Sequence, residues 1–435
     1  MHYTFKQKFH AVGQGLFYSS SLSSGTSDAH IVFDCGSDKI DFINREVAEY
    51  KKEVVEIDLL ILSHLHYDHI SGLDELLKDM KVKTIILPYL NKYERILLQI
   101  SYGTKAQWYS DFLDNPYNWL SEKENITNIV VINGNGEQSN DNEEIPFQDF
   151  NPDVSFEVKN SLTKNDADKN KIEADESITF NGKISVCHTQ GYIQIANLYF
   201  KFFNYQIDST KLNNFKTAIN SLGIKDTQSL LNILKDPKQR KNLEKAYEQI
   251  EKYDLNKTSL VAYQGLIFSK DRSHIHVEAT SSCNSLPIFL KRCCWNHCDY
   301  FIHKYFHRHS THNRYIYDLH CHCENSCKNM MGTLLLGDIK LDYKQTKRKD
   351  EFFNYFVNLL KTVQIIQLSH HGANNGWNDK LISEISPSCL YIASHAVKNH
   401  YKHPHKEVLI TLARNQRHYI SVTEYDEWYV EFIYM

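Results

Sequence analysis

An apolar run that ends in a cluster of ionisable side chains constrains the fold of this chain more than any other feature. Residues 58–73 read DLLILSHLHYDHISGL, with three histidines and an aspartate between His64 and His69. Such groups are costly to bury unless they are paired or bind a metal. Because side chains two apart on an extended chain point the same way, His64 and His66 can reach one cation. A tight turn then lets Asp68 and His69 reach a second position, and these ligand types suit zinc, manganese or iron.

The composition is that of a globular protein and also favours metal. Of 435 residues, 42% are hydrophobic and 23% charged, which is enough apolar material for a substantial core. The start, MHYTFKQKFH, lacks a secretory signal and no apolar run is long enough to span a membrane, so we expect a cytoplasmic protein with no membrane contact. In the reducing cytoplasm we expect the ten cysteines to be thiols or metal ligands rather than disulfides. The 23 histidines also favour metal binding. The net charge of −4 excludes a global positive field for a polyanion, so metals and a local patch would have to hold nucleic acid.

Short β-like runs alternate with helical spacing at both ends of the chain, which predicts one α/β domain over residues 1–435 with two sheets and helices outside. Three insertions interrupt it. Residues 134–177 read as a polar loop, residues 205–254 as a helical insertion, and residues 265–332 as a Cys/His-rich insertion.

The segment SHLHYDHISGL resembles the signature loop of the metallo-β-lactamase-fold hydrolases. LLLGD, with Asp338, and LSHHGANN, with His370 and His371, follow in the order of that family, and AVGQG and IVFDCGS resemble its opening strands. NKTSLVAYQG and NHYKHPHKEVL resemble, more narrowly, the nuclease-like domain of ComEC-type DNA-uptake proteins and their stand-alone relatives. The resemblance implies a four-layer αββα sandwich, here with a Cys/His-rich insertion.

The resemblance also implies two divalent metal ions, zinc or manganese, that share a hydroxide in a metal-dependent hydrolase. The implied ligands are His64 and His66 for one metal, Asp68, His69 and either His370 or His371 for the other, and Asp338 as the bridge. Asp68 and His403 are the implied catalytic residues. His403, in HYKHPHK, matches a histidine that would bind a phosphate oxygen or protonate the leaving group. For the third histidine of the family, His188 in VCHTQG is the candidate.

The substrate is less constrained than the metal ligands. Leu16 stands where ComEC-type proteins have an acidic residue, and Lys402 replaces a glycine before His403. We expect a nuclease or phosphodiesterase that acts on nucleic acid or nucleotides. The alternatives are a hydrolase of small esters, lactones or phosphoesters, and a non-catalytic binding module of a defence or competence assembly. The sequence does not predict the oligomeric state.

The Cys/His-rich insertion carries seven of the ten cysteines. Structural zinc needs four thiolate or imidazole ligands in two short-range pairs. Candidates for such a site are Cys294, Cys298, Cys321, Cys323 and Cys327. The alternative is an aromatic, basic arm with free thiols, which would contact a nucleic-acid strand or cover the metal site.

Overall fold

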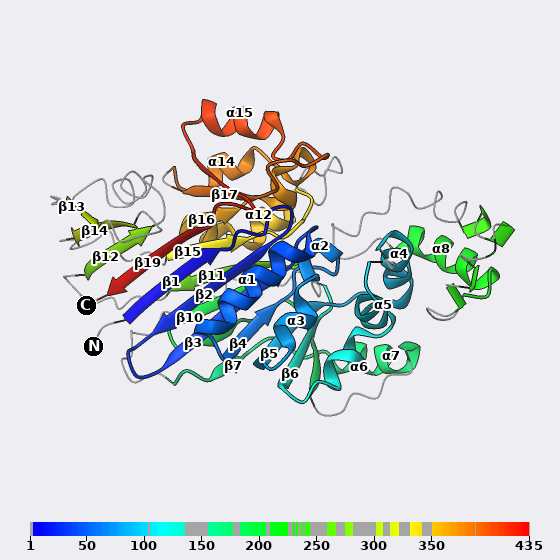
Figure 1. Cartoon of the computed structure of the whole chain (residues 1–435). Coiled ribbons are helices and arrows are strands. Elements are labelled where there is room, and N and C mark those ends of the chain that lie inside the picture. Colours follow the sequence, from blue (N-terminus) through cyan, green and yellow to red (C-terminus); the bar gives the residue numbers. More distant parts are fainter. Residues whose placement is uncertain are drawn as a thin grey trace.

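The computed structural model describes most of the chain. The described residues are 3–102, 105–134, 155–176, 183–205, 209–224, parts of 229–243, 259–266, 275–281, 302–307, 314–321, 331–341, 350–387 and 389–434. Within them, strands and helices alternate as the sequence predicts (Figure 1). No helix in this part of the chain is long and apolar enough to cross a membrane.

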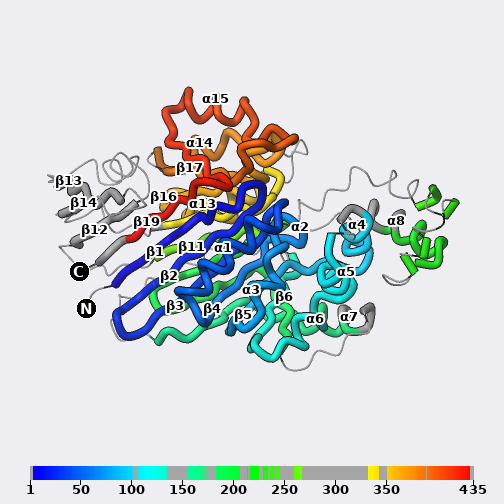
Figure 2. The backbone as a smooth tube through the Cα atoms, in the orientation of Figure 1, coloured from blue at the N-terminus to red at the C-terminus, as the bar shows by residue number. Residues whose placement is uncertain are grey.

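The first of two sheets is antiparallel at one side and parallel at the other. In spatial order it contains β13 (Ile302–His307), β14 (Arg314–Cys321), β12 (Ile275–Ser281), β19 (Trp428–Tyr434), β1 (Tyr3–Phe9), β2 (Phe17–Ser23), β3 (Asp28–Cys35), β4 (Glu56–Ile61), β5 (Lys81–Pro88), β6 (Ile126–Ile132) and β8 (Ile184–Cys187). The strands from β3 to β8 run parallel. Figure 2 shows how the last strand, in red, returns beside the first, in blue.

The second sheet combines antiparallel and parallel pairs in the same way. It contains, in order, β18 (His418–Val422), β17 (Leu390–Ser394), β16 (Val363–Gln367), β15 (Met331–Leu335), β11 (Val261–Leu266), β10 (Leu198–Phe203), β9 (Ile193–Ile195) and β7 (Val158–Asn160). The strands from β15 to β18 are parallel. Both sheets therefore have a parallel half, and the carboxyl ends of parallel strands are where loops build sites in such folds.

Helices cover the outer faces of both sheets. The helices of the first half are α1 (Ile40–Glu53), α2 (Tyr67–Ile70), α3 (Leu73–Leu77), α4 (Lys92–Tyr102), α5 (Gln107–Asp114), α6 (Pro116–Ser121), α7 (Asp166–Glu176) and α8 (Ser209–Ser221). Those of the second half are α12 (Glu351–Tyr355), α13 (Val357–Leu360), α14 (Lys380–Glu384) and α15 (Lys406–Arg414). Figure 1 shows α1 and α3 on one side of the molecule and α14 and α15 on the other.

Three buried apolar clusters show the four layers. One lies between the two sheets, the second between the first sheet and helices such as α1 and α3, and the third between the second sheet and helices such as α12 and α15. β4 is buried on both faces, which explains why polar and apolar residues do not alternate in its sequence. Leu59 and Ile61 face the core between the sheets, while Ile57 and Leu60 face the helices. The predicted helix–sheet–sheet–helix fold is confirmed.

The insertions differ in part from the predictions. Residues 134–177 are not all loop, because β7 and α7 form there; Oδ1 of Asn165 accepts a hydrogen bond from N of Asp168 at 2.9 Å, an N-terminal capping signal that the polar composition hid. α8 forms in the predicted helical insertion of residues 205–254, and much of the remainder of that insertion lies outside the described residues.

The Cys/His-rich insertion contributes strands β12 to β14 to the edge of the first sheet, beside β19. It leaves the second sheet after β11 and returns to it at β15, so this insertion connects both sheets. Cys321 is the last residue of β14. The other zinc candidates, Cys294, Cys298, Cys323 and Cys327, lie outside the described residues, and the structural zinc stays a prediction.

Candidate metal centre

Side chains from both sheets meet where the parallel strands end. His64 follows β4, Asp338 follows β15, and His371 follows β16. His66 directly precedes α2, which carries Asp68 and His69. Segments as far apart in sequence as Asp68 and His371 therefore share one edge of the sandwich.

The backbone packs very closely behind α2. A Cβ atom on Gly36 would lie 2.3 Å from the backbone carbon of His69 and 2.5 Å from the carbonyl oxygen of Asp68. Any residue with a Cβ atom at position 36 would force the backbone of Gly36 or of α2 to move. The glycine of IVFDCGS is therefore needed for the position of α2 and of the two ligand candidates that it carries.

Three overlapping groups of potential metal ligands form in the described residues. They are Asp34 with His64 and His69, His64 with His66 and Asp338, and Asp68 with His69 and His371, and the ligand atoms within each group lie within 4.8 Å of one another. The last two groups contact each other, because Nε2 of His69 is 3.2 Å from Oδ1 of Asp338.

Each of three histidines has an acceptor at its Nδ1 atom. His371 donates from Nδ1 to the carbonyl oxygen of Ser394 at 2.8 Å, and His69 lies 2.8 Å from Oδ2 of Asp34. The Ser63 hydroxyl donates its one proton to Asp34, so it accepts from Nδ1 of His64 at 2.9 Å. Because Nδ1 carries the proton in each ring, the Nε2 lone pair of each is left for a metal.

The three Nε2 atoms face carboxylate oxygens at distances that a cation would fill. Nε2 of His64 is 3.6 Å from Oδ2 of Asp338, and Nε2 of His371 is 3.3 Å from Oδ2 of Asp68. Nε2 of His64, Nε2 of His69 and Oδ1 of Asp338 are buried and have no hydrogen-bond partner. Buried atoms of this kind are usually satisfied. Nitrogen and oxygen ligands that converge without partners fit a divalent metal.

The electrostatics agree with a site built for positive charge. Burial alone would lower the pKa of His69, but the carboxylates of Asp338 and Asp68 outweigh it and hold this pKa well above its usual range. Burial would likewise raise the pKa of Asp338, yet His69, His370 and His64 lower it well below its usual range. The carboxylates are therefore held ionised, and positive charge beside them is favoured.

The late loop places its two histidines differently. Both have left-handed backbone angles, with φ of 50° for His370 and 58° for His371, which costs about 1–3 kcal/mol per residue. His371 groups with Asp68 and His69, whereas His370 belongs to none of the three groups in the described residues. Nε2 of His370 is 3.7 Å from Oδ2 of Asp338, and its side chain is 25% exposed. The geometry thus separates two neighbours that the sequence left as alternatives.

Asp338 is held by the loop that carries it. Gly337 has φ of 54°, and a Cβ atom there would lie 2.7 Å from Cβ of Ser63. The side chain of Gln367 accepts hydrogen bonds from N of Leu336 and N of Gly337, both at 2.8 Å. The hydrogen bonds hold the loop after β15 against the end of β16, and Gly337 packs on Ser63 in the loop after β4, so Asp338 approaches His64 from the opposite sheet.

His403 lies over the late histidines. Its ring centroid is 5.2 Å from that of His370 and 6.0 Å from that of His371. Asn399 holds its backbone, because Oδ1 of Asn399 accepts from N of His403 at 2.8 Å, and Nε2 of Gln14 lies 3.5 Å from its Nδ1 atom. Burial, helped by the charges of His371 and His370, lowers the pKa of His403 to about 3.

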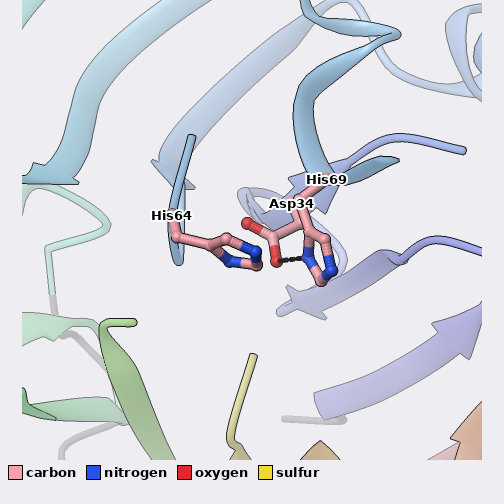
Figure 3. A group of neighbouring side chains, drawn as sticks. All are labelled: Asp34, His64 and His69. Carbon is pink, nitrogen blue, oxygen red and sulfur yellow. Dashed lines mark hydrogen bonds and ion pairs between the residues drawn. The ribbon is translucent and has the colours of Figure 1, made fainter. Parts of the chain in front are cut away.

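Asp34 is the site residue that sequence reasoning missed. It ends the neighbouring strand β3 and is fully buried, and Oδ1 accepts from N of Ser63 at 2.6 Å. Figure 3 shows its carboxylate between the rings of His64 and His69. Since its oxygens are already hydrogen-bonded, Asp34 orients His69 rather than binding metal itself. The signal available in the sequence was an aspartate at the end of an apolar run, in IVFDCGS.

His188 is not brought to this centre. It follows β8 and is in none of the ligand groups of the described residues. Its Nε2 atom lies 2.8 Å from Nδ2 of Asn165, at the start of α7. The structure therefore gives no support to His188 as the third histidine of the family.

One comparison with known proteins finds a family. Residues 15–147 match the model of the metallo-beta-lactamase superfamily, a range that includes HLHYDH and stops before Asp338. No curated protein matches the chain. With its two packed sheets and outer helices, the fold is the metallo-β-lactamase sandwich. The match and the grouped histidines and aspartates support a metal-dependent hydrolase.

Proposed function

We propose that this protein is a di-metal hydrolase that cleaves phosphodiester bonds of nucleic acid or nucleotides. One metal would be held by His64, His66 and Asp338, and the other by Asp68, His69 and His371. The observation that carries the proposal is the contact between the two groups, where Asp338 and His69 face each other at 3.2 Å. A carboxylate at that position can serve both metals.

The chemistry divides between the metals and the chain. When bound, a pair of divalent cations lowers the pKa of water and stabilises the charge that develops on both oxygens of a displacement. The chain holds the ligand rings in one orientation through Asp34, Ser63 and the carbonyl of Ser394. His403 would donate a hydrogen bond to a phosphoryl oxygen, since it lies beside the ligands and its backbone is held by Asn399.

Motif order favours a phosphodiester over other substrates. NKTSLVAYQG, LLLGD, LSHHG and NHYKHPHKEVL occur in the order of ComEC-type nuclease domains. A small ester, lactone or phosphoester is the second candidate, because the net charge of −4 offers no general attraction to a polyanion. The two candidates differ in which substrate is turned over by the same residues.

The test is an assay of the purified full chain with Mn²⁺ or Zn²⁺ on single-stranded DNA, RNA, bis(p-nitrophenyl) phosphate and a β-lactam. We expect cleavage of the phosphodiesters. Asp338→Asn keeps the shape of the side chain but removes its charge, and should lower kcat by about 100-fold or more and reduce bound metal. His188→Gln is the matched control, because His188 also follows a parallel strand of the first sheet but lies outside the ligand groups.

Thermal unfolding of each variant separates loss of activity from loss of folding. Turnover of the β-lactam or of small esters alone would replace the phosphodiesterase proposal with the second candidate. Asp338→Asn that remains folded and retains wild-type activity would contradict the proposed metal pair.

A further inference from the structure

A short series of neighbouring rings leads from the surface to the candidate metal centre. His400 and Tyr401, in the loop between β17 and α15, have ring centroids 3.7 Å apart. Tyr401 lies 5.6 Å from His403 with 19° between the planes, and His403 lies 6.0 Å from His371 with 25° between the planes. His371 contacts Asp68. The rings therefore connect solvent to a proposed metal ligand.

The outer end of this series is exposed and the inner end is not. Tyr401 retains 48% of its surface in solvent, whereas His403 retains 8%. His400 is exposed as well. An aromatic ring that is open to solvent yet aligned with the rings of a site offers apolar surface to a ligand.

The loop that carries the rings is internally hydrogen-bonded. Nδ2 of Asn399 donates to the carbonyl oxygens of Ala396 and His403, each at 2.8 Å. Nε2 of His405 lies 3.2 Å from the carbonyl oxygen of Tyr401. Little further ordering is needed on binding, so less of the binding free energy is lost to entropy.

Charges around the rings fit a nucleotide strand. Lys398 and Lys402 are exposed on the same loop. Tyr401 reaches the candidate metal centre through His403, whose ring lies between those of Tyr401 and the proposed ligand His371. A strand with a phosphate at the metals could thus bring a neighbouring base to the rings.

We infer that His400 and Tyr401 form a stacking platform for a nucleobase next to the scissile phosphate, and that they favour single-stranded substrates. The inference rests on the proposed phosphodiesterase function. Every base has a π face, so stacking on aromatic side chains tolerates any sequence. In a duplex the bases already stack on each other and would have to unstack to reach the platform. Tyr401 is then a substrate-positioning residue rather than a catalytic one.

The test compares two polymers of equal length and charge, oligothymidylate and an abasic deoxyribose phosphate polymer. We expect metal-loaded wild-type protein to prefer oligothymidylate. Tyr401→Ala should raise KM for oligothymidylate about tenfold, the expected effect of losing one stacked base, with little change in kcat. It should leave the abasic polymer unaffected, and Tyr401→Phe should behave as wild type. Tyr425→Ala is the control, an exposed tyrosine outside the ring series.

The outcomes separate this inference from the proposed function. Equal losses on both polymers in Tyr401→Ala, or no preference in the wild type, would overturn the platform. If neither polymer is cleaved, the proposed function fails, and fluorescence anisotropy of the same labelled polymers tests the platform alone. Tighter binding of oligothymidylate than of the abasic polymer by the wild type, lost in Tyr401→Ala, would then support the platform. Equal binding of the two polymers by the wild type would overturn it.

Discussion

Replacing Asp34 with asparagine tests how the site prepares its ligands. The Asp34 carboxylate accepts three hydrogen bonds, from N of Ser63 at 2.6 Å, from Oγ of Ser63 at 2.5 Å and from Nδ1 of His69 at 2.8 Å. Asparagine has one acceptor oxygen and two donor hydrogens. If that oxygen keeps the bond to the Ser63 amide, the amide nitrogen faces His69. The histidine ring must then accept at Nδ1 and carry its proton on Nε2.

That change of tautomer removes the lone pair that a metal needs. We expect Asp34→Asn to lower affinity for one metal by about 10- to 100-fold, or about 1.4–2.7 kcal/mol, the range for residues that orient metal ligands. The metal held by His69 should be affected more than the one held by His66. Loss of a hydrogen bond to a charged group should also lower the free energy of unfolding of the metal-free protein, by about 1.5–3 kcal/mol.

The assay is competition for Mn²⁺ or Zn²⁺ with a chelator of known affinity, combined with chemical denaturation of the metal-free protein. Asp58→Asn is the matched control. Asp58 is also a buried aspartate on the neighbouring strand, and it accepts from N of His30 at 2.8 Å and from Nζ of Lys83 at 2.6 Å. It belongs to none of the ligand groups found in the described residues. The control should lose stability but keep metal affinity. Asp34→Asn with wild-type affinity for both metals would refute the reasoning.

Two further predictions concern Gly337, beside the site, and the buried histidine His10. Gly337→Ala should lower the free energy of unfolding and the affinity for metal, because the new Cβ atom would meet Cβ of Ser63 at 2.7 Å. Gly25→Ala is the control for the backbone cost of about 1–3 kcal/mol, because Gly25 has φ of 82° and a Cβ atom there would have nothing within 4 Å. Equal losses of stability in both variants would contradict a role for the Ser63 contact. Burial lowers the pKa of His10, with Glu46 opposing, so His10 favours folding while neutral, and this contribution should fall as the pH decreases below about 6.5. Denaturant unfolding between pH 7.5 and 5 should therefore show a smaller loss for His10→Gln than for wild type, and parallel losses would argue against it.

Much of the fold was readable because its strands and helices have clear apolar spacing. The segment KIDFINREVAEYKKE has apolar residues at helical spacing and forms α1, with Ile43, Val47 and Tyr50 buried on one face. Residues 351–360 form two short helices, α12 and α13, rather than one continuous helix, with a break at Phe356. Its backbone angles are not helical, and apolar spacing does not report such a break.

The candidate site was readable where ligands follow one another in sequence and less so where they depend on the tertiary fold. The motif HLHYDH identifies several ligand candidates by itself. Asp34, in contrast, can orient His69 only because β3 and β4 are neighbours in the sheet. The different positions of the His370 and His371 side chains depend on left-handed backbone angles at both residues. Residues other than glycine rarely adopt such angles, and no pattern in the sequence predicts them. Roles that depend on strand order and backbone strain need coordinates.

Anomalous diffraction from crystals of the full chain loaded with Mn²⁺ or Zn²⁺ tests the central claim most directly. The account predicts two neighbouring peaks at the ends of β4 and β15, one beside His64 and His66, the other beside Asp68, His69 and His371, with the carboxylate of Asp338 between them. A single peak, or peaks only among the cysteines of the insertion, would contradict it.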